Sequence, residues 1–243
     1  MNLGLKTKLI KYTGRETLLY KIIDASLFEL LCFINYLKYG HIIRKNYIKN
    51  YLLKYENMKL QIGSGGELCP GFLNSNVIGG PIHLDIRKKL PFKNSILDTI
   101  YGNSVIAHIY KKDLMSFLKE SYRVLKSDGK LILNTPDIKK IVSTFYFDKE
   151  YNKMVIISKK HMDVSLDDNF YIASFINNIS HLFHAIKYIY DFEYLRHLLE
   201  LSGFKNVKLV DNTTTSDKDI NEMRSGFKGK YWDFTTMTIE AEK

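Results

Sequence analysis

A short apolar run followed at once by glycines is the feature that most constrains this fold. Residues 58–62 have the pattern of a buried strand, and Gly63-Ser64-Gly65-Gly66 follows directly. Glycines at the carboxyl end of a strand let a ligand approach the backbone closely, and their N–H groups can meet its polar atoms. Because glycine turns are common, the elements that follow decide what this turn means.

Strands and helices alternate along the chain after residue 57. Apolar runs predict strands at 58–62, 72–77, 82–86, 97–101, 130–134, 207–210 and 234–240. Helices are predicted at 113–125, where residues 126–129 form the stop, from residue 138 onward, and at 192–201. A polar loop is predicted before the last strand. Such alternation is typical of an α/β fold with a mostly parallel sheet and helices on both faces.

Polar residues gather where the predicted strands end. They occupy residues 63–66, 74–76, 85, 101–104 and 134–137. The carboxyl ends of parallel strands share one edge of a sheet, and ligands of open α/β sheets bind outside that edge. The sequence therefore predicts one polar crevice there.

Composition favours a single core with a helical addition. The chain has 243 residues, 45% of them hydrophobic, which excludes a disordered tail or a collagen-like fibre. Its two cysteines, Cys32 and Cys69, lie far apart, so neither a disulfide framework nor a cysteine zinc site is expected. We expect a cytoplasmic protein with a basic helical extension at 1–57 and a main domain at 58–243. An insertion at about 148–190 interrupts the alternation.

Positive charge is concentrated near the N-terminus. The first 59 residues hold eleven Lys and Arg against four Asp and Glu, a net of +7 out of +10 for the chain. Two helices are predicted over 17–55, broken near Gly40. The apolar stretch 27–37 contains Glu29 and is shorter than the ~20 residues of a spanning helix. Residues 17–55 therefore form either helices packed on the domain with a solvated lysine face, or a peripheral attachment to an anionic membrane at its inner face. Nucleic acid is not expected as a partner, because no aromatic-basic RNA motif is present.

Several motifs together resemble a known family. They are LQIGSGG at 60–66, PGFLNSN at 70–76, LDIRKKLPF at 84–92, YRVLK at 122–126 and DG at 128–129. In this order they are similar to class I S-adenosylmethionine-dependent methyltransferases of the type 11 group. The likeness is greatest to a branch of bacterial enzymes linked to cell-surface saccharide synthesis. It spans about residues 58–142 and returns at 190–195 and 199–204, and it leaves the N-terminal 55 residues outside.

The resemblance implies a Rossmann-like seven-stranded sheet with an antiparallel last strand and S-adenosyl-L-methionine as cofactor. It implies that Gly63, Ser64 and Gly65 adjoin the methionine part of the cofactor. It places Asn76 at the ribose hydroxyls and Asp85 at the adenine amino group. It also places Asn103 and Ser104, after the fourth strand, at the border of cofactor and acceptor.

Three positions depart from the family pattern. Asn76 stands where the family has an acidic residue, and Asn103 and Ala107 replace two usual glutamates. A carboxylate binds a ribose diol more strongly than an amide does, by about 1–3 kcal/mol. These changes leave two hypotheses open. One is an active O-methyltransferase acting on a small-molecule or saccharide hydroxyl, and the other is a degenerate binding or scaffold protein with the same fold.

Two residues are candidates for a catalytic base. His108 matches a family histidine that faces the crevice, and its ordinary pKa lies near neutrality, although a histidine at a helix start more often has a structural role. Asp137 follows the fifth strand, but we favour a role as the N-cap of the helix that begins at residue 138.

No metal site is expected. His181 and His184 are spaced for one metal and His161 is near them in sequence, but no Cys or Glu completes a recognisable pattern. An aromatic set in or near the insertion could form a ligand platform, although we favour a role in the core. Its members are Tyr171, Phe175, Phe183, Tyr188 and Tyr190.

Overall fold

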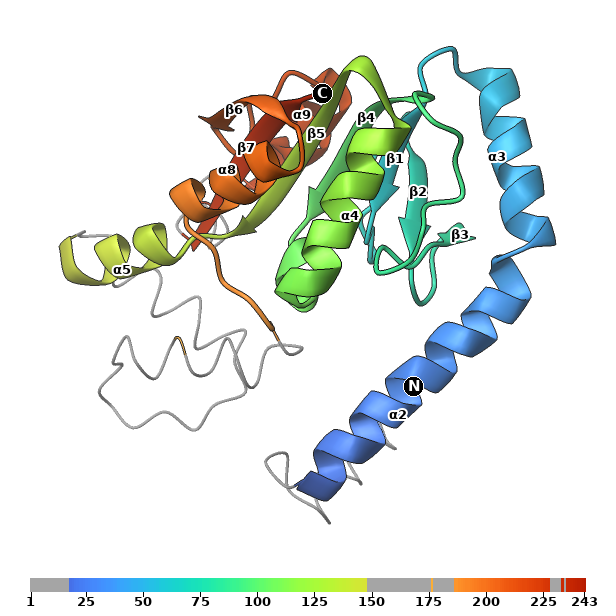
Figure 1. Cartoon of the computed structure of the whole chain (residues 1–243), viewed down its shortest axis with the longest axis horizontal. Coiled ribbons are helices and arrows are strands. Elements are labelled where there is room, and N and C mark those ends of the chain that lie inside the picture. Colours follow the sequence, from blue (N-terminus) through green and yellow to red (C-terminus); the bar gives the residue numbers. More distant parts are fainter. Residues whose placement is uncertain (1–17, 148–175, 177–185, 228–232, 234) are drawn as a thin grey trace.

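A seven-stranded sheet forms the centre of the molecule (Figure 1). The computed structural model describes residues 18–147, 176, 186–227, 233 and 235–243. The strands lie in the order β3-β2-β1-β4-β5-β7-β6. They are β1 (Lys59–Ile62), β2 (Leu73–Asn76), β3 (Ile82–His83), β4 (Leu97–Asn103), β5 (Leu125–Pro136), β6 (Lys205–Val210) and β7 (Thr236–Glu242). The predicted α/β class and the seven strands are confirmed.

Strand directions also agree with the prediction. β1 pairs in parallel with β2 and β4, β2 with β3, and β4 with β5. β7 is antiparallel to both of its neighbours, β5 and β6. The first five strands therefore end at the same edge, which puts the predicted polar clusters on one side of the sheet.

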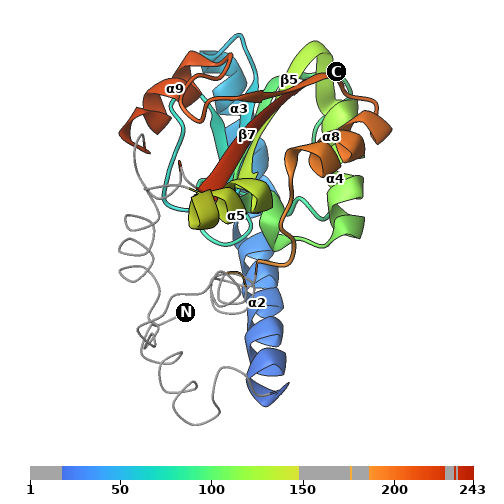
Figure 2. The ribbon, with the colours of Figure 1, turned by 90° about the vertical axis from the view of Figure 1, so that its left-hand side faces the viewer.

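Amphipathic helices bury one face of the sheet. α4 (Lys111–Val124) and α8 (Phe192–Leu201) each carry apolar residues at helical spacing. Their buried side chains join the main core with those of β1, β4 and β5. They are Leu114, Phe117, Leu118 and Val124 on α4, and Leu195, Leu198 and Leu199 on α8. Figure 2 shows both helices on the same side of the sheet.

The opposite face is covered by a helix that the sequence did not predict. α9 (Lys218–Arg224) lies in the region predicted as a polar loop, and its Ile220 packs with Cys69, Phe72 and Tyr101. The Asp217 side chain caps it by accepting hydrogen bonds from the amides of Asp219 and Ile220. The loop prediction was wrong because the short helix carries only two apolar side chains toward the core, too few for a periodic signal.

α9 compensates for a short connection between β1 and β2. Residues 63–72 contain no helix, because a crossover between parallel strands usually needs a dozen residues or more. Lys59 of β1 forms ion pairs with Asp217 and Asp219 at 2.6 and 3.0 Å, which tie α9 to the strand. A C-terminal segment thus covers a surface that a crossover helix would otherwise cover.

Of two N-terminal helices, α3 (Ile42–Lys54) stands beside the β3 edge of the sheet, and α2 (Leu18–Tyr39) runs from the same corner away from the sheet (Figure 1). α2 and α3 meet at Gly40, as predicted. Any side chain at Gly40 would clash with the Tyr36 carbonyl, which explains the glycine. α3 joins the main core through buried Tyr51, whose hydroxyl donates to the Gly71 carbonyl at 2.7 Å. Within the described part of the chain, no helix is long and apolar enough to span a membrane.

Three predicted boundaries shift. β5 already begins at Leu125, so residues 126–129 are an irregular part of the strand and do not form a loop after α4. β3 contains only Ile82 and His83, and Asp85 lies in the turn that follows. Among the described residues β7 begins at Thr236 and extends to Glu242.

The final helix before the 148–190 region is α5 (Ile138–Phe147). Residues 148–175 and 177–185 of the predicted insertion lie outside the described residues.

Candidate functional site

The glycine loop after β1 leaves bare backbone at the strand end. Gly63 and Gly65 have φ angles of +60° and +54°, which disfavour any other residue. A side chain at Gly63 would collide with Val105, whereas at Gly65 and Gly66 it would point into open space. Backbone that is both exposed and free of side chains can accept a close ligand.

Ser64 is buried within this loop with an unused hydroxyl. Its N–H donates to the Ser75 carbonyl at 2.9 Å, which joins the loop to β2. Its Oγ has no hydrogen-bond partner among the residues that the structure describes. Buried hydroxyls without a partner are uncommon, so this atom marks a place where a polar ligand atom would be satisfied.

Gln61 shapes the glycine loop, and sequence reasoning missed it. Its buried side chain donates to the Glu67 carbonyl at 2.9 Å and accepts from the Cys69 amide at 2.8 Å. Ser75 Oγ donates to the Gln61 carbonyl at 2.7 Å. The available signal was a polar side chain in the middle of an apolar strand, because such a residue must find partners when buried.

Asn76 ends β2 and is committed to the turn that follows. Its Nδ2 donates to the Ile78 carbonyl, and its Oδ1 accepts from the Val77 amide, both at 2.9 Å. A Cβ at Gly80 would lie 3.0 Å from Asn76 Cβ and 3.6 Å from Ser64 Oγ, so this turn lies against the glycine loop. One N–H and one lone pair of the amide remain for a ligand.

Asp85 is buried, and Arg87 clamps its carboxylate. Arg87 Nε donates to Oδ1 at 3.0 Å and Nη2 donates to Oδ2 at 2.9 Å, while the Arg87 amide also reaches Oδ1 at 3.0 Å. Burial alone would raise the pKa of Asp85, but these hydrogen bonds outweigh it and hold the pKa below its ordinary value. The carboxylate that the resemblance places at the adenine amino group thus already accepts hydrogen bonds from Arg87.

Arg87 also connects the turn after β3 to α2. Its Nη1 donates to Glu29 at 2.6 Å, and its guanidinium lies 5.9 Å from the centre of the Phe28 ring. The pKa of Glu29 is lowered by the hydrogen bond from Arg87. One arginine therefore bridges the turn after β3 and the N-terminal helix.

The end of β4 lies next to the glycine loop and to β5. Asn103 Nδ2 lies 3.5 Å from Glu67 Oε2, and the Ser104 amide donates to the Asn134 carbonyl at 2.8 Å. Ser104 takes a left-handed φ of 55°, which turns the chain into the short helix η1 (Val105–His108). Val105 of that helix is the residue that abuts Gly63. The ends of β1, β4 and β5 are thereby brought together.

The two candidate bases occupy different settings. His108 is the last residue of η1 and is partly buried beside the end of β4. Asp137 accepts from the Lys139 amide at 2.9 Å through Oδ1, and its carbonyl accepts from the Ile141 amide at 2.9 Å, so it caps α5 as predicted. Burial raises the pKa of Asp137, and the backbone amides of Lys140 and Lys139 partly oppose this.

A strap after the insertion runs along the same strand ends. The amides of Lys187 and Tyr188 donate to the Ala107 carbonyl at 2.7 and 3.2 Å, and Tyr190 forms a bridge with Asp137. Tyr190 is fully buried, which confirms its predicted role in the core, and Tyr188 packs against it. The remaining aromatic candidates, Tyr171, Phe175 and Phe183, lie outside the described residues, as do His161, His181 and His184.

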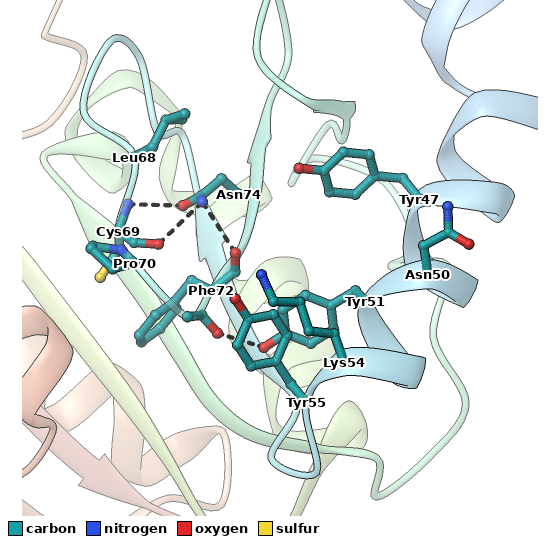
Figure 3. Close-up of a pocket in the computed structure, with 11 residues that line it drawn as sticks. Tyr47, Asn50, Tyr51, Lys54, Tyr55, Leu68, Cys69, Pro70, Phe72 and Asn74 are labelled. Atoms are coloured by element: carbon teal, nitrogen blue, oxygen red, sulfur yellow. Dashed lines mark hydrogen bonds between the residues drawn. The ribbon is translucent and has the colours of Figure 1, made fainter.

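A separate hollow of about 490 Å³ opens between α3 and the β1–β2 connection (Figure 3). The Tyr47 hydroxyl and the Lys54 ammonium group point into it from α3. Asn74 lines the other side, but its amide bonds to the Cys69 and Phe72 carbonyls. None of the glycine-loop residues 63–66 line this hollow, so it lies apart from the glycine loop.

Comparison with known proteins gives a match over part of the chain. Residues 65–133 match the family model described as a methyltransferase domain. This match covers β2, β3, β4 and most of β5. No curated protein matches the chain by sequence. The seven-stranded sheet with its reversed β7 is a Rossmann-like methyltransferase fold.

Solved methyltransferase structures are among those similar to this chain. An S-adenosylmethionine-dependent methyltransferase from Archaeoglobus fulgidus is 17% identical, with coverage of 87% of this chain and 99% of that one and a TM-score of 0.47. A similar enzyme from Aquifex aeolicus is 11% identical, with coverage of 82% and 88% and a TM-score of 0.39. Phosphoethanolamine N-methyltransferase 2 from Haemonchus contortus, solved with S-adenosylhomocysteine, is 13% identical, with coverage of 82% and 52% and a TM-score of 0.42.

Proposed function

We propose that this protein is an S-adenosyl-L-methionine-dependent methyltransferase that acts on a hydroxyl group of a small molecule or saccharide. The observation that carries the proposal is the end of β1. There, open backbone at Gly65 and Gly66 lies beside the unpartnered Ser64 hydroxyl, at the edge where five parallel strands end. The match of residues 65–133 to a methyltransferase domain supports the same activity.

The described residues fit the cofactor on one side and constrain it on the other. Gly63, Ser64 and Gly65 would hold the methionine part through backbone groups and the free hydroxyl. Asn76 would offer its remaining N–H and lone pair to the ribose hydroxyls. Asp85 would have to share its carboxylate between Arg87 and the adenine amino group, because the arginine already occupies both oxygens.

The acceptor side depends mainly on alignment. The cofactor supplies an electrophilic methyl group on a sulfonium, so the protein has to hold a nucleophile in line with it. Correct positioning can contribute up to about 7–11 kcal/mol to lowering a barrier. His108 would accept the hydroxyl proton at neutral pH. Asp137 is less suited to this role because its carboxylate caps α5.

Calorimetric titration with S-adenosylmethionine and S-adenosylhomocysteine tests the cofactor site. We expect saturable binding by the unmodified chain and at least a tenfold loss in Gly65→Ala, whose methyl group would enter the open space. Gly79→Ala is the matched control, since Gly79 has a similar left-handed φ of +71° and open surroundings. Its amide faces Asn35 of α2. The control corrects for backbone strain and should bind within about twofold of the unmodified chain, on the scale of a few tenths of a kcal/mol.

Absence of heat and of a thermal shift at millimolar cofactor would overturn the proposal in favour of the degenerate binding protein. If binding is found, transfer of labelled methyl groups to a panel of small hydroxyl compounds and saccharides tests the acceptor. His108→Gln should then lower kcat by about 10²–10⁴ without changing cofactor affinity. The exposed His197 on α8 provides the control, and His197→Gln should leave kcat unchanged.

A further inference from the structure

α2 carries a continuous apolar face that points away from the domain. Its members recur at helical spacing over almost the whole helix, and Leu37 near its end is 64% exposed. We call this face the α2 stripe: Leu19, Ile22, Leu30, Phe33, Ile34 and Leu37, all of them exposed. Monomeric proteins rarely expose large contiguous apolar patches, and those that do use them for interaction.

Polar contacts fix the stripe in its outward direction. On the other side of α2, Glu29 pairs with Arg87, Asn35 Oδ1 accepts from the Gly79 amide at 3.2 Å, and the Tyr36 ring meets that of His83. Cys32 is the only buried residue among the α2 side chains that the structure describes. The helix therefore docks on the domain mainly through polar groups and leaves its most apolar side to solvent.

The next helix along the chain, α3, also exposes basic and apolar residues. On α3, Ile42, Lys45, Lys49 and Leu53 recur on one side of the helix, and all four are exposed. Ile42 is 72% and Leu53 79% exposed. Lysines next to exposed large apolar side chains form a surface that suits an anionic lipid bilayer, where the apolar groups enter the interface and the ammonium groups meet phosphates.

We propose that α2 and α3 bind the surface of an anionic lipid membrane, with the α2 stripe inserted in the interface and Lys45 and Lys49 at the headgroups. The charge balance favours this occupant over a second copy of the chain. Residues 18–54 hold six Lys and Arg against two Asp and Glu, so pairing of two identical segments would bring positive charges together. Anionic lipid supplies the opposite charge.

Flotation of the full chain with vesicles tests this proposal. Vesicles of neutral phosphatidylcholine are compared with vesicles that contain phosphatidylglycerol as well, at low and high salt. We expect recovery with the anionic vesicles, little with the neutral ones, and a decrease at high salt. The stripe variant Leu30→Ser/Phe33→Ser/Leu37→Ser should reduce binding at least tenfold. The matched control, Leu201→Ser/Leu209→Ser, alters exposed leucines on α8 and β6 and should change nothing.

A charge variant separates the electrostatic part. Lys45→Gln/Lys49→Gln should weaken binding to anionic vesicles by about tenfold or more, since each basic residue near an anionic surface contributes roughly fivefold. Lys112→Gln/Lys119→Gln, on exposed positions of α4, is the control. Circular dichroism confirms that each variant is folded.

Three results would overturn the proposal. The first is absence of flotation with anionic vesicles, and the second is equal recovery with neutral and anionic vesicles. The third is a dimer in solution that the stripe variant converts to a monomer while vesicle binding stays unchanged, which would assign the stripe to a second copy. None of these outcomes depends on cofactor binding, so they are distinguishable from a failure of the proposed activity.

Discussion

α2 and α4 have similar apolar periodicity but opposite relations to the core. α4 buries Phe117 and Leu118 against the sheet, whereas α2 exposes Phe33 and Leu37. Both are helices for the same reason, since their apolar residues recur at three and four. The difference teaches that periodicity defines a face but does not choose its partner. A hydrophobic face turned outward needs a partner beyond the domain.

The two helices are also held by different forces. Burial of each large apolar side chain of α4 contributes about 1.5–3 kcal/mol. α2 relies instead on hydrogen bonds and one ion pair. A hydrogen bond between neutral partners contributes about 0.5–1.5 kcal/mol. α2 is therefore expected to open locally at lower free energy than α4, and amide hydrogen exchange would measure this order.

Replacement of the same residue type in the two helices gives the largest expected contrast. Phe117→Ala should lower the free energy of unfolding by about 3–5 kcal/mol, because it leaves a cavity under the sheet. Phe33→Ala should change it by no more than about 0.5 kcal/mol, as is usual for surface positions. Urea denaturation measures both. A cost above about 1.5 kcal/mol for Phe33→Ala would show that the stripe is covered within the chain.

Arg87 is expected to have the next largest effect. Arg87→Met would leave the buried Asp85 carboxylate without its clamp, at a cost of about 1–3 kcal/mol. It would also release α2, so hydrogen exchange of α2 amides should accelerate while that of α4 amides follows only the global change.

Glu29→Gln tests the α2 end of the same bridge. Glu29 is exposed, and its pair with Arg87 should contribute no more than about 1 kcal/mol. Equal costs for Glu29→Gln and Arg87→Met would contradict the view that Asp85 dominates this contact.

The smallest expected effect is a pH dependence of stability that comes from His83, whose ring contacts Tyr36 of α2. Burial lowers the pKa of His83, although its bond with the Val77 carbonyl at 2.9 Å opposes this. The folded state therefore favours neutral His83. The contribution of His83 to stability is present above its ordinary pKa of 6.5 and is lost as the pH falls through the lowered value. Thermal unfolding between pH 7.5 and 5 measures it.

His83→Gln should flatten this pH profile. The lowered pKa of Asp85 acts in a separate window, since its contribution is present above its ordinary pKa of 3.8 and lost only at lower pH. If His83→Gln left the pH profile of thermal unfolding unchanged, His83 would not be the source of this pH dependence.

Much of the site was predictable because its signals are local. The strand before Gly63, the ends at Asn76, Asn103 and Ser104, and the N-cap at Asp137 all follow from short sequence patterns. No such sequence pattern predicts the hydrogen bonds from Arg87 to Asp85. Which partner a carboxylate takes depends on the position of side chains around it, and Arg87 is also oriented by Glu29, 58 residues away.

By itself, the sequence determined the alternation of strands and helices, the break at Gly40 and the bare backbone after β1, because periodicity, glycine and proximity along the chain act over a few residues. Tertiary structure decided that α9 covers the face left open by the short β1–β2 connection, and that α2 turns its apolar side outward. Both outcomes depend on which surfaces meet in the folded chain. The local sequence does not specify this, either for a short helix with two apolar residues or for an apolar stripe whose partner lies outside its own segment.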